Sequence, residues 1–70
     1  MQWFANLLRG RVRVEVVGAY PERLINLCAT NGLAFWGIEW IDETTFRFTV
    51  AFWHWKKLRT LAGRAMCELS

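Results

Sequence analysis

The sequence predicts a small α+β domain with three strands and two main helices in the order β, α, β, β, α. Three observations carry this prediction. Residues 44–52 alternate between large apolar side chains and polar or small ones, which is typical of a strand with one buried face. Residues 11–17 alternate in the same way. After residue 53 the apolar side chains recur at helical spacing.

A short amphipathic helix is expected ahead of the first strand. Its apolar side chains fall at i, i+1, i+4 and i+5 and are Trp3, Phe4, Leu7 and Leu8. So short a helix is not stable alone in water, and Gly10 ends the pattern. We therefore expect the segment to dock, either as a lid on the edge of the core or as an aromatic contact with a membrane or a partner.

The first strand and the helix after it have clear patterns. The strand presents three core residues and three solvent residues, namely Val12, Val14 and Val16 against Arg11, Arg13 and Glu15. Pro21 is expected at the first helical position, where an N–H would be unbonded in any case. Asn31-Gly32 is expected to end the helix. The core stripe of this helix is predicted to be Leu24, Leu27 and Cys28, with Ile25 at its edge.

A hairpin is predicted for residues 35–52, with its turn at Asp42-Glu43. In its first strand the core side is assigned to Trp36, Ile38 and Trp40, and the open side to Phe35, Gly37, Glu39 and Ile41. In its second strand the core side is assigned to Phe46, Phe48, Val50 and Phe52, and the open side to Thr45, Arg47, Thr49 and Ala51. The second strand has the stronger pattern, and we expect it at the centre of the sheet.

The last helix is expected to run from about Trp53 to the end of the sequence. Its core stripe is predicted to be Leu58, Leu61, Ala62, Ala65 and Leu69. No stop signal precedes the last residue, which favours a fragment of a longer chain. A right-handed crossover makes the first two strands parallel, and the hairpin places the third strand between them. This predicts a three-stranded mixed sheet of order 1-3-2, half of a ferredoxin-like fold, with both long helices on one face.

Composition allows one small domain with more aromatic surface than a small core can bury. The 70 residues include five Trp and five Phe, and 54% are hydrophobic. The net charge of +3 permits contact with anionic lipid or nucleic acid, although a solvated surface explains it equally well. Cys28 and Cys67, expected on different helices, are too few for a disulfide scaffold and predict free thiols in a reducing compartment. Neither a signal peptide nor a membrane-spanning run is apparent, so the isolated chain is expected to be soluble.

The sequence contains no pattern of residues that is typical of catalysis. His54, the one histidine, has no acid near it in sequence, and Cys28 and Cys67 are too scattered to complete a nucleophile pair or a zinc site with it. No glycine-rich phosphate loop is present. We expect no enzymatic activity, no metal and no cofactor.

Two surfaces could bind an anionic partner. Arg11, Arg13 and Arg47 could hold phosphates on the open face of the sheet, but acidic residues interrupt them, and the central strand shows Arg47 and Thr49 where base-stacking aromatics would be needed. Nucleic acid is therefore an unlikely partner. The last helix places Trp53 and Trp55 beside Lys56 and Lys57, which suits an anionic membrane interface. The alternative is a solvated helix face with two tryptophans that pack on the sheet edge.

The residues also resemble a known family. The segments WFANLLRGRVRVEVVG, YPERLINLCATNGLAFWGIEW and WKKLRTLAGRAMCEL look like the N-terminal region of the YqfD sporulation proteins of endospore-forming bacteria. The resemblance covers essentially the whole chain. It implies the N-terminal domain of a longer membrane protein that acts in the mother cell during sporulation. It implies neither an enzymatic activity nor a cofactor. The basic residues of the last helix favour the cytoplasmic side for this domain.

These observations together predict a non-enzymatic interaction or assembly domain that acts through protein–protein contacts. The expected partners are other sporulation membrane proteins or a second copy of the chain. The candidate contact residues are Trp3, Phe4, Leu7, Leu8, Arg11, Arg13, Arg47, Trp53, Trp55, Lys56 and Lys57. The alternative function is a basic module that binds an anionic lipid surface or nucleic acid.

Overall fold

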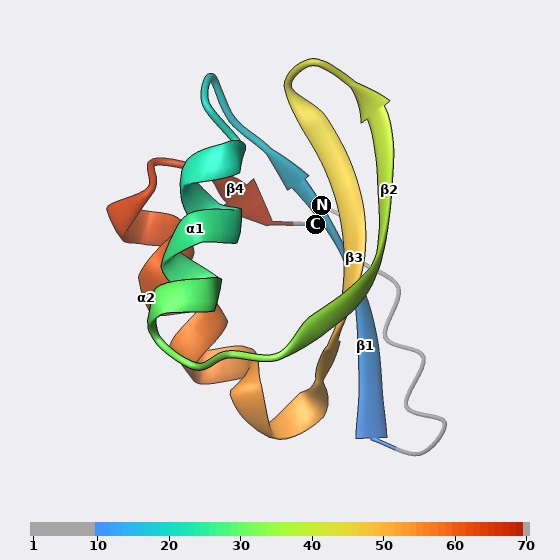
Figure 1. Cartoon of the computed structure of the whole chain (residues 1–70), viewed down its shortest axis with the longest axis vertical. Helices are drawn as coiled ribbons and strands as arrows, with labels where there is room; N and C mark the ends of the chain where they lie inside the picture. The colour runs from blue at the N-terminus through green and yellow to red at the C-terminus, as the bar shows by residue number, and fades with distance from the viewer. Residues whose placement is uncertain (1–9, 70) are drawn as a thin grey trace.

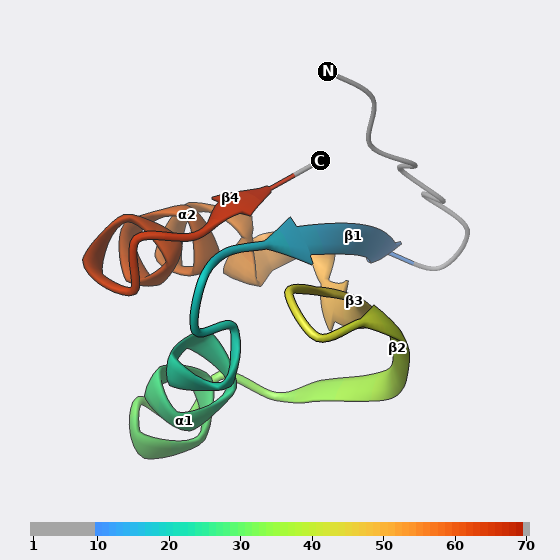
Figure 2. The same ribbon diagram turned by 90° about the horizontal axis from the view of Figure 1, so that it is seen from above.

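A computed structural model describes residues 10–69, so the predicted N-terminal helix with Trp3, Phe4, Leu7 and Leu8 lies outside the described residues. The elements are β1 (Arg11–Val17), α1 (Glu22–Thr30), β2 (Phe35–Asp42), β3 (Thr45–Ala51), the 3-10 helix η2 (Phe52–His54), α2 (Trp55–Arg64) and β4 (Glu68–Leu69). The α-helices lie side by side on one face of the sheet (Figures 1 and 2). The α+β class and the placement of both helices on one face agree with the sequence prediction.

The sheet differs from the prediction in strand number and in pairing. Its order is β2-β3-β1-β4, and all three neighbouring pairs are antiparallel. The third strand does lie between the first two, but the three-stranded mixed sheet is wrong. β1 and β2 point the same way without being neighbours, so no parallel pair forms between them. The additional strand, β4, pairs with β1.

The core is formed by one face of the sheet and the facing sides of α1 and α2. In β1 and β3 each predicted core residue is fully buried, which confirms the predicted core side, whereas Ala51, predicted on the open side, is buried as well. The fully buried strand residues are Val12, Val14, Val16, Phe46, Phe48 and Val50. The helices add Leu24, Cys28, Leu58, Leu61 and Ala62, and Ala65 directly after α2 completes this set. Full burial of a Val, Leu or Phe side chain contributes about 1.5–3 kcal/mol to the stability of the fold. Phe52, also predicted in the core, begins η2 instead and is half exposed.

Both α-helices end in the same backbone motif. After α1, the N–H of Gly32 bonds to the carbonyl of Ala29, and the next N–H bonds back to Cys28, which is the Schellman pattern. Gly32 has the positive φ that this motif requires, so the predicted helix end is confirmed. After α2, Met66 occupies the equivalent position with a φ of 58°, and the N–H of Cys67 bonds to the carbonyl of Ala62.

The predicted continuation of the last helix to the end of the sequence is therefore wrong. α2 ends at Arg64, and the chain turns at Met66 and adds Glu68 and Leu69 to the sheet as β4. Glycine normally signals such a turn because it adopts positive φ without strain. A methionine at this position gives no sequence signal. Leu69 packs against the core from a strand, and Cys67 lies after the helix rather than within it.

A bulge interrupts the pairing of β2 with β3. Trp36 pairs with Thr49, and Glu39 pairs with Arg47, so two residues of β2 stand opposite one residue of β3 between these pairs. Gly37, the first of the two, has a φ of 66°, a conformation that favours glycine in bulges of this kind. Because successive side chains of a strand point to opposite faces of the sheet, one extra residue moves each preceding side chain of β2 to the opposite face.

The bulge explains why the face assignment of β2 is wrong in its first half. Phe35 lies on the core side, with its ring centroid 5.5 Å from that of Phe48, whereas Trp36 lies on the open face. The sequence prediction had these two residues the other way round. Between the bulge and Trp40 the predicted phase is correct, because the ring centroids of Trp40 and Phe46 are 5.1 Å apart. A second register shift follows between Trp40 and Asp42.

Candidate interaction surfaces

The open face of the sheet carries paired charges. Arg47 Nε lies 3.1 Å from Glu15 Oε1, and Arg13 Nη2 lies 3.4 Å from Glu39 Oε1. Arg13 also donates from Nη1 to the Gly37 carbonyl at 2.6 Å. Two of the three arginines that the sequence offered as phosphate contacts thus have acidic neighbours. An anion would have to displace those carboxylates, which makes this face a poor site for phosphate.

The third arginine of that group lies at the end of the open face, beside two tryptophans. Arg11 places its guanidinium 5.7 Å from the centroid of Trp36, within the range of a cation–π contact. A hollow here is lined by Gly10, Arg11, Ala34, Trp36, Ala51, Trp53 and His54. Trp53 is 74% exposed, so this predicted contact residue is accessible. His54 Nδ1 is buried, and no residue from 10 to 69 forms a hydrogen bond with it.

β2 forms one edge of the sheet and exposes large apolar side chains. The exposed fractions of its apolar residues are 41% for Trp36, 38% for Ile38, 48% for Trp40 and 47% for Ile41. β3 pairs with one side of this strand, and no other described strand pairs with the second side. Sequence reasoning assigned three of these four residues to the core and so missed the surface. The signal available was Gly37 within a long apolar strand, which often marks a bulge.

The helical side of the molecule carries most of the unpaired basic residues. α2 contains Lys56, Lys57, Arg59 and Arg64 and no acidic residue. Lys57 donates to the carbonyl of Asn31 at 2.7 Å and so joins α2 to the end of α1. Trp55, which the sequence offered as a contact residue, packs partly buried against the core. The two predicted tryptophans therefore differ, since only Trp53 is largely exposed.

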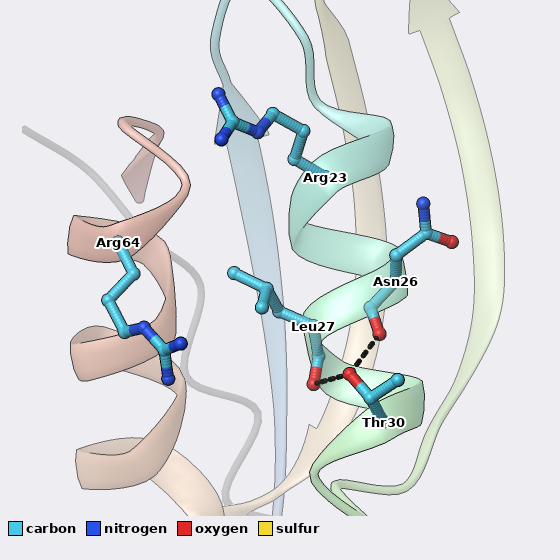
Figure 3. A pocket seen from close by; sticks show the side chains of 5 residues that line it. All are labelled: Arg23, Asn26, Leu27, Thr30 and Arg64. Carbon is cyan, nitrogen blue, oxygen red and sulfur yellow. Dashed lines mark hydrogen bonds between the residues drawn. The ribbon is translucent and has the colours of Figure 1, made fainter.

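A groove runs between α1 and α2, and sequence reasoning did not identify it. Its lining residues are Arg23, Asn26, Leu27, Thr30 and Arg64, and both arginines extend toward the space between the helices (Figure 3). The four residues from α1 have the spacing i, i+3, i+4 and i+7, which places them on one helix face. That spacing was visible in the sequence, but the approach of Arg64 was not.

Three titratable groups of the described chain have shifted pKa values, and two of them are thiols. Burial raises the pKa of the Cys28 thiol to about 11 and also raises the pKa of Cys67, so neither is an activated nucleophile at neutral pH. Hydrogen bonds from the backbone N–H and the hydroxyl of Thr44 lower the pKa of Asp42, which caps the turn after β2. Within residues 10–69, no three His, Cys, Asp or Glu side chains gather as a metal site.

Comparison with known protein families identifies a relationship that covers nearly the whole chain. The family described as "Putative stage IV sporulation protein YqfD" matches residues 6–70. No curated protein and no solved structure shows significant similarity to the chain. No helix in the described part of the chain is long and apolar enough to cross a membrane.

Proposed function

The chain belongs to the YqfD family of sporulation proteins, and we propose that it serves there as a non-enzymatic assembly domain whose main contact surface is the edge strand β2. The partner is a second copy of the chain or another sporulation membrane protein. In this proposal the full-length protein is membrane-associated in the mother cell, with this domain on the cytoplasmic side.

The exposed apolar edge of β2 is the observation that carries the proposal. An edge strand offers unpaired N–H and C=O groups that can pair with a strand of another chain. Most edge strands are protected by charged side chains, whereas β2 has Glu39 and Asp42 as its only charged residues. Of these, Glu39 is paired with Arg13 and Asp42 with the following turn. Four large apolar side chains, each more than a third exposed, are left for a partner to cover.

The N-terminal segment supplies a second proposed contact. Its predicted apolar stripe is Trp3, Phe4, Leu7 and Leu8. The segment precedes Gly10, which lines the hollow beside Trp36 and Trp53. Contacts from this segment would extend the apolar surface of β2 at the end where Trp36 lies.

Sedimentation equilibrium tests the proposal across a range of protein concentrations. The chain should associate, and Ile38→Lys or Ile41→Lys should shift it to monomer because a charge then interrupts the apolar edge. Tyr20→Lys is the matched control, since Tyr20 is 68% exposed and lies outside β2. Comparison of residues 1–70 with residues 10–70 separates the contribution of the N-terminal segment.

A sporulation assay of the same variants tests whether β2 binds another protein instead of a second copy of the chain. Ile38→Lys should reduce spore formation while Tyr20→Lys does not. A chain that is monomeric at every concentration, together with normal sporulation of the Ile38→Lys strain, would contradict the proposal.

The alternative function is binding of an anionic surface through α2. The four basic residues of that helix, with no acidic residue among them, favour it, and the exposed Trp53 lies nearby. Such binding should weaken steeply with salt, whereas apolar pairing at β2 should not. Nucleic acid is the less favoured anion, because the two arginines on the open face already have acidic neighbours.

A further inference from the structure

Arg23 and Arg64 face the same groove from two different helices. Arg23 lies in the first turn of α1, and Arg64 is the last residue of α2. Figure 3 shows both side chains reaching toward the space between the helices, with Leu27 between them. The groove has a volume of about 350 Å³, which is at the lower end of the range for small-molecule sites.

Neither arginine forms an ion pair with any residue from 10 to 69. The two ion pairs in that range involve Arg13 and Arg47, on the opposite side of the sheet. The residues that line the groove include no carboxylate, and α2 has none along its whole length. The groove therefore gathers positive charge without compensation from the described part of the chain.

Arg23 lies at the end of α1 that disfavours a basic side chain. The N-terminal end of a helix carries a partial positive charge, so a basic residue in the first turn is unfavourable there. Arg64 at the end of α2 has the opposite, favourable placement. Figure 3 shows the guanidinium group of Arg23 directed toward the start of α1 and that of Arg64 directed toward its later turns. An anion bound in the groove between them would relieve the unfavourable placement of Arg23.

We infer that this groove binds a phosphate-bearing ligand, with Arg23 and Arg64 as its anion contacts. Guanidinium groups recognise phosphate through paired, charge-assisted hydrogen bonds. Leu27 offers an apolar surface for the organic part of the ligand. A soluble phosphate ester and the headgroup of a phospholipid share this chemistry. The inference does not depend on the role proposed for β2.

Titration with inorganic phosphate, followed by two-dimensional NMR of the full chain at constant ionic strength, tests the site. Phosphate should produce saturable shifts at the amides of Arg23, Leu27 and Arg64 and at the side-chain Nε–H groups of both arginines. Arg23→Gln and Arg64→Gln should each weaken binding about tenfold, because each removes charge-assisted hydrogen bonds.

Arg59→Gln is the matched control for net charge. Arg59 lies on the same helix as Arg64 and outside the groove. Its loss removes only a long-range attraction to the phosphate that salt screens, so binding should weaken less than about twofold. All three variants should keep the folded spectrum. If Arg59→Gln and Arg23→Gln weakened phosphate binding equally, the proposed site would be wrong, because the overall positive charge of the surface would then account for the binding. A lack of saturable shifts would overturn it as well.

Vesicles distinguish the two sources of the ligand. Phosphatidylcholine vesicles with and without phosphatidic acid are sedimented with the wild-type chain and with the Arg23→Gln/Arg64→Gln double variant. Binding that needs phosphatidic acid and fails in the double variant supports the site with a lipid headgroup as its ligand. Vesicle binding that is absent, or equal in both proteins, while the NMR titration still depends on both arginines, supports the site with a soluble phosphate ester.

Discussion

Arg13 Nη1 donates a 2.6 Å hydrogen bond to the carbonyl oxygen of Gly37, at the bulge of β2. The same nitrogen also donates to Thr49 Oγ1 at 3.0 Å. Arg13 therefore joins three strands, since it lies on β1, Gly37 on β2 and Thr49 on β3. The bulge that exposes Trp36 is thus fixed by a side chain on a strand that does not pair with β2.

Replacement of Gly37 should destabilise the domain. Gly37→Ala puts a β-carbon at a φ of 66° and 3.1 Å from Arg13 Nη1, and the left-handed conformation alone costs about 1–2 kcal/mol in a residue other than glycine. Gly63→Ala is the control, because Gly63 lies in α2 and, apart from its chain neighbours and the backbone of its own helix, no described atom lies within 4 Å of the added carbon. It should stabilise the helix by about 0.5–1 kcal/mol. Urea unfolding measures both, and equal effects would contradict the role of the bulge.

Loss of Arg13 should cost more than loss of Arg47. Arg13→Gln removes donors to a backbone carbonyl, a hydroxyl and a carboxylate. Water competes for these bonds because the Arg13 side chain is 30% exposed, so we expect them to contribute about 1–2 kcal/mol together, below the roughly 1.5–3 kcal/mol that each buried bond to a charged group can contribute. Arg47→Gln removes one partly exposed ion pair, worth roughly 0–1 kcal/mol. We expect Arg13→Gln to be more destabilising by about 1 kcal/mol in urea unfolding. A larger loss for Arg47→Gln would show that the link across the three strands is unimportant.

The closeness of Gly18 and Cys67 should make β4 sensitive to a single methyl group. A β-carbon on Gly18 would lie 2.7 Å from Cys67 Sγ and 3.3 Å from Cys67 Cα. Gly18→Ala should therefore displace the segment before β4 and cost about 1–3 kcal/mol, as overpacking usually does. In a Cys67→Ala background the penalty should be smaller, because the closest contact is gone, and a double-mutant cycle measures the difference. The same penalty in both backgrounds would place the strain elsewhere.

The stability of the domain should fall at alkaline pH because of Cys28. Burial raises the pKa of this thiol from 9.0 to about 11. Between these values the unfolded chain loses the thiol proton while the folded chain retains it, so ionisation favours the unfolded state alone. The free energy of unfolding should be unaffected by Cys28 below pH 9 and should decrease as the pH rises from 9 to about 11. Urea unfolding at several pH values should show a flatter dependence for Cys28→Ala, and an unchanged slope would contradict this cause.

The thiols of Cys28 and Cys67 should differ in their rate of reaction with iodoacetamide. Cys28 is fully buried in α1, whereas Cys67 is half-buried beside β4. Cys67 should be alkylated first in the folded protein at pH 8, and both should react at similar rates in urea. Mass spectrometry of digested samples measures the two rates. Faster reaction of Cys28 would indicate that the core opens more readily than the end of the chain.

The sequence by itself determined the elements whose signals are local. The alternation of apolar and polar residues in β1 and β3 predicted their buried faces, because neighbouring residues of a strand point to opposite faces of the sheet. Asn31-Gly32 predicted the end of α1, since glycine is the usual residue at that turn. The short motifs along the chain also indicated the YqfD family, and the comparison over residues 6–70 confirms it.

The tertiary structure alone decided the features that depend on a neighbour. The facing of Trp36 follows from the bulge at Gly37, which Arg13 of another strand supports. The turn at Met66 exists because β1 offers an edge to which β4 can pair, and a methionine carries no local signal for it. Arg23 and Arg64 line one groove only because α1 and α2 pack side by side. Side-chain periodicity reports which face of an element is buried, whereas these features depend on which elements become neighbours.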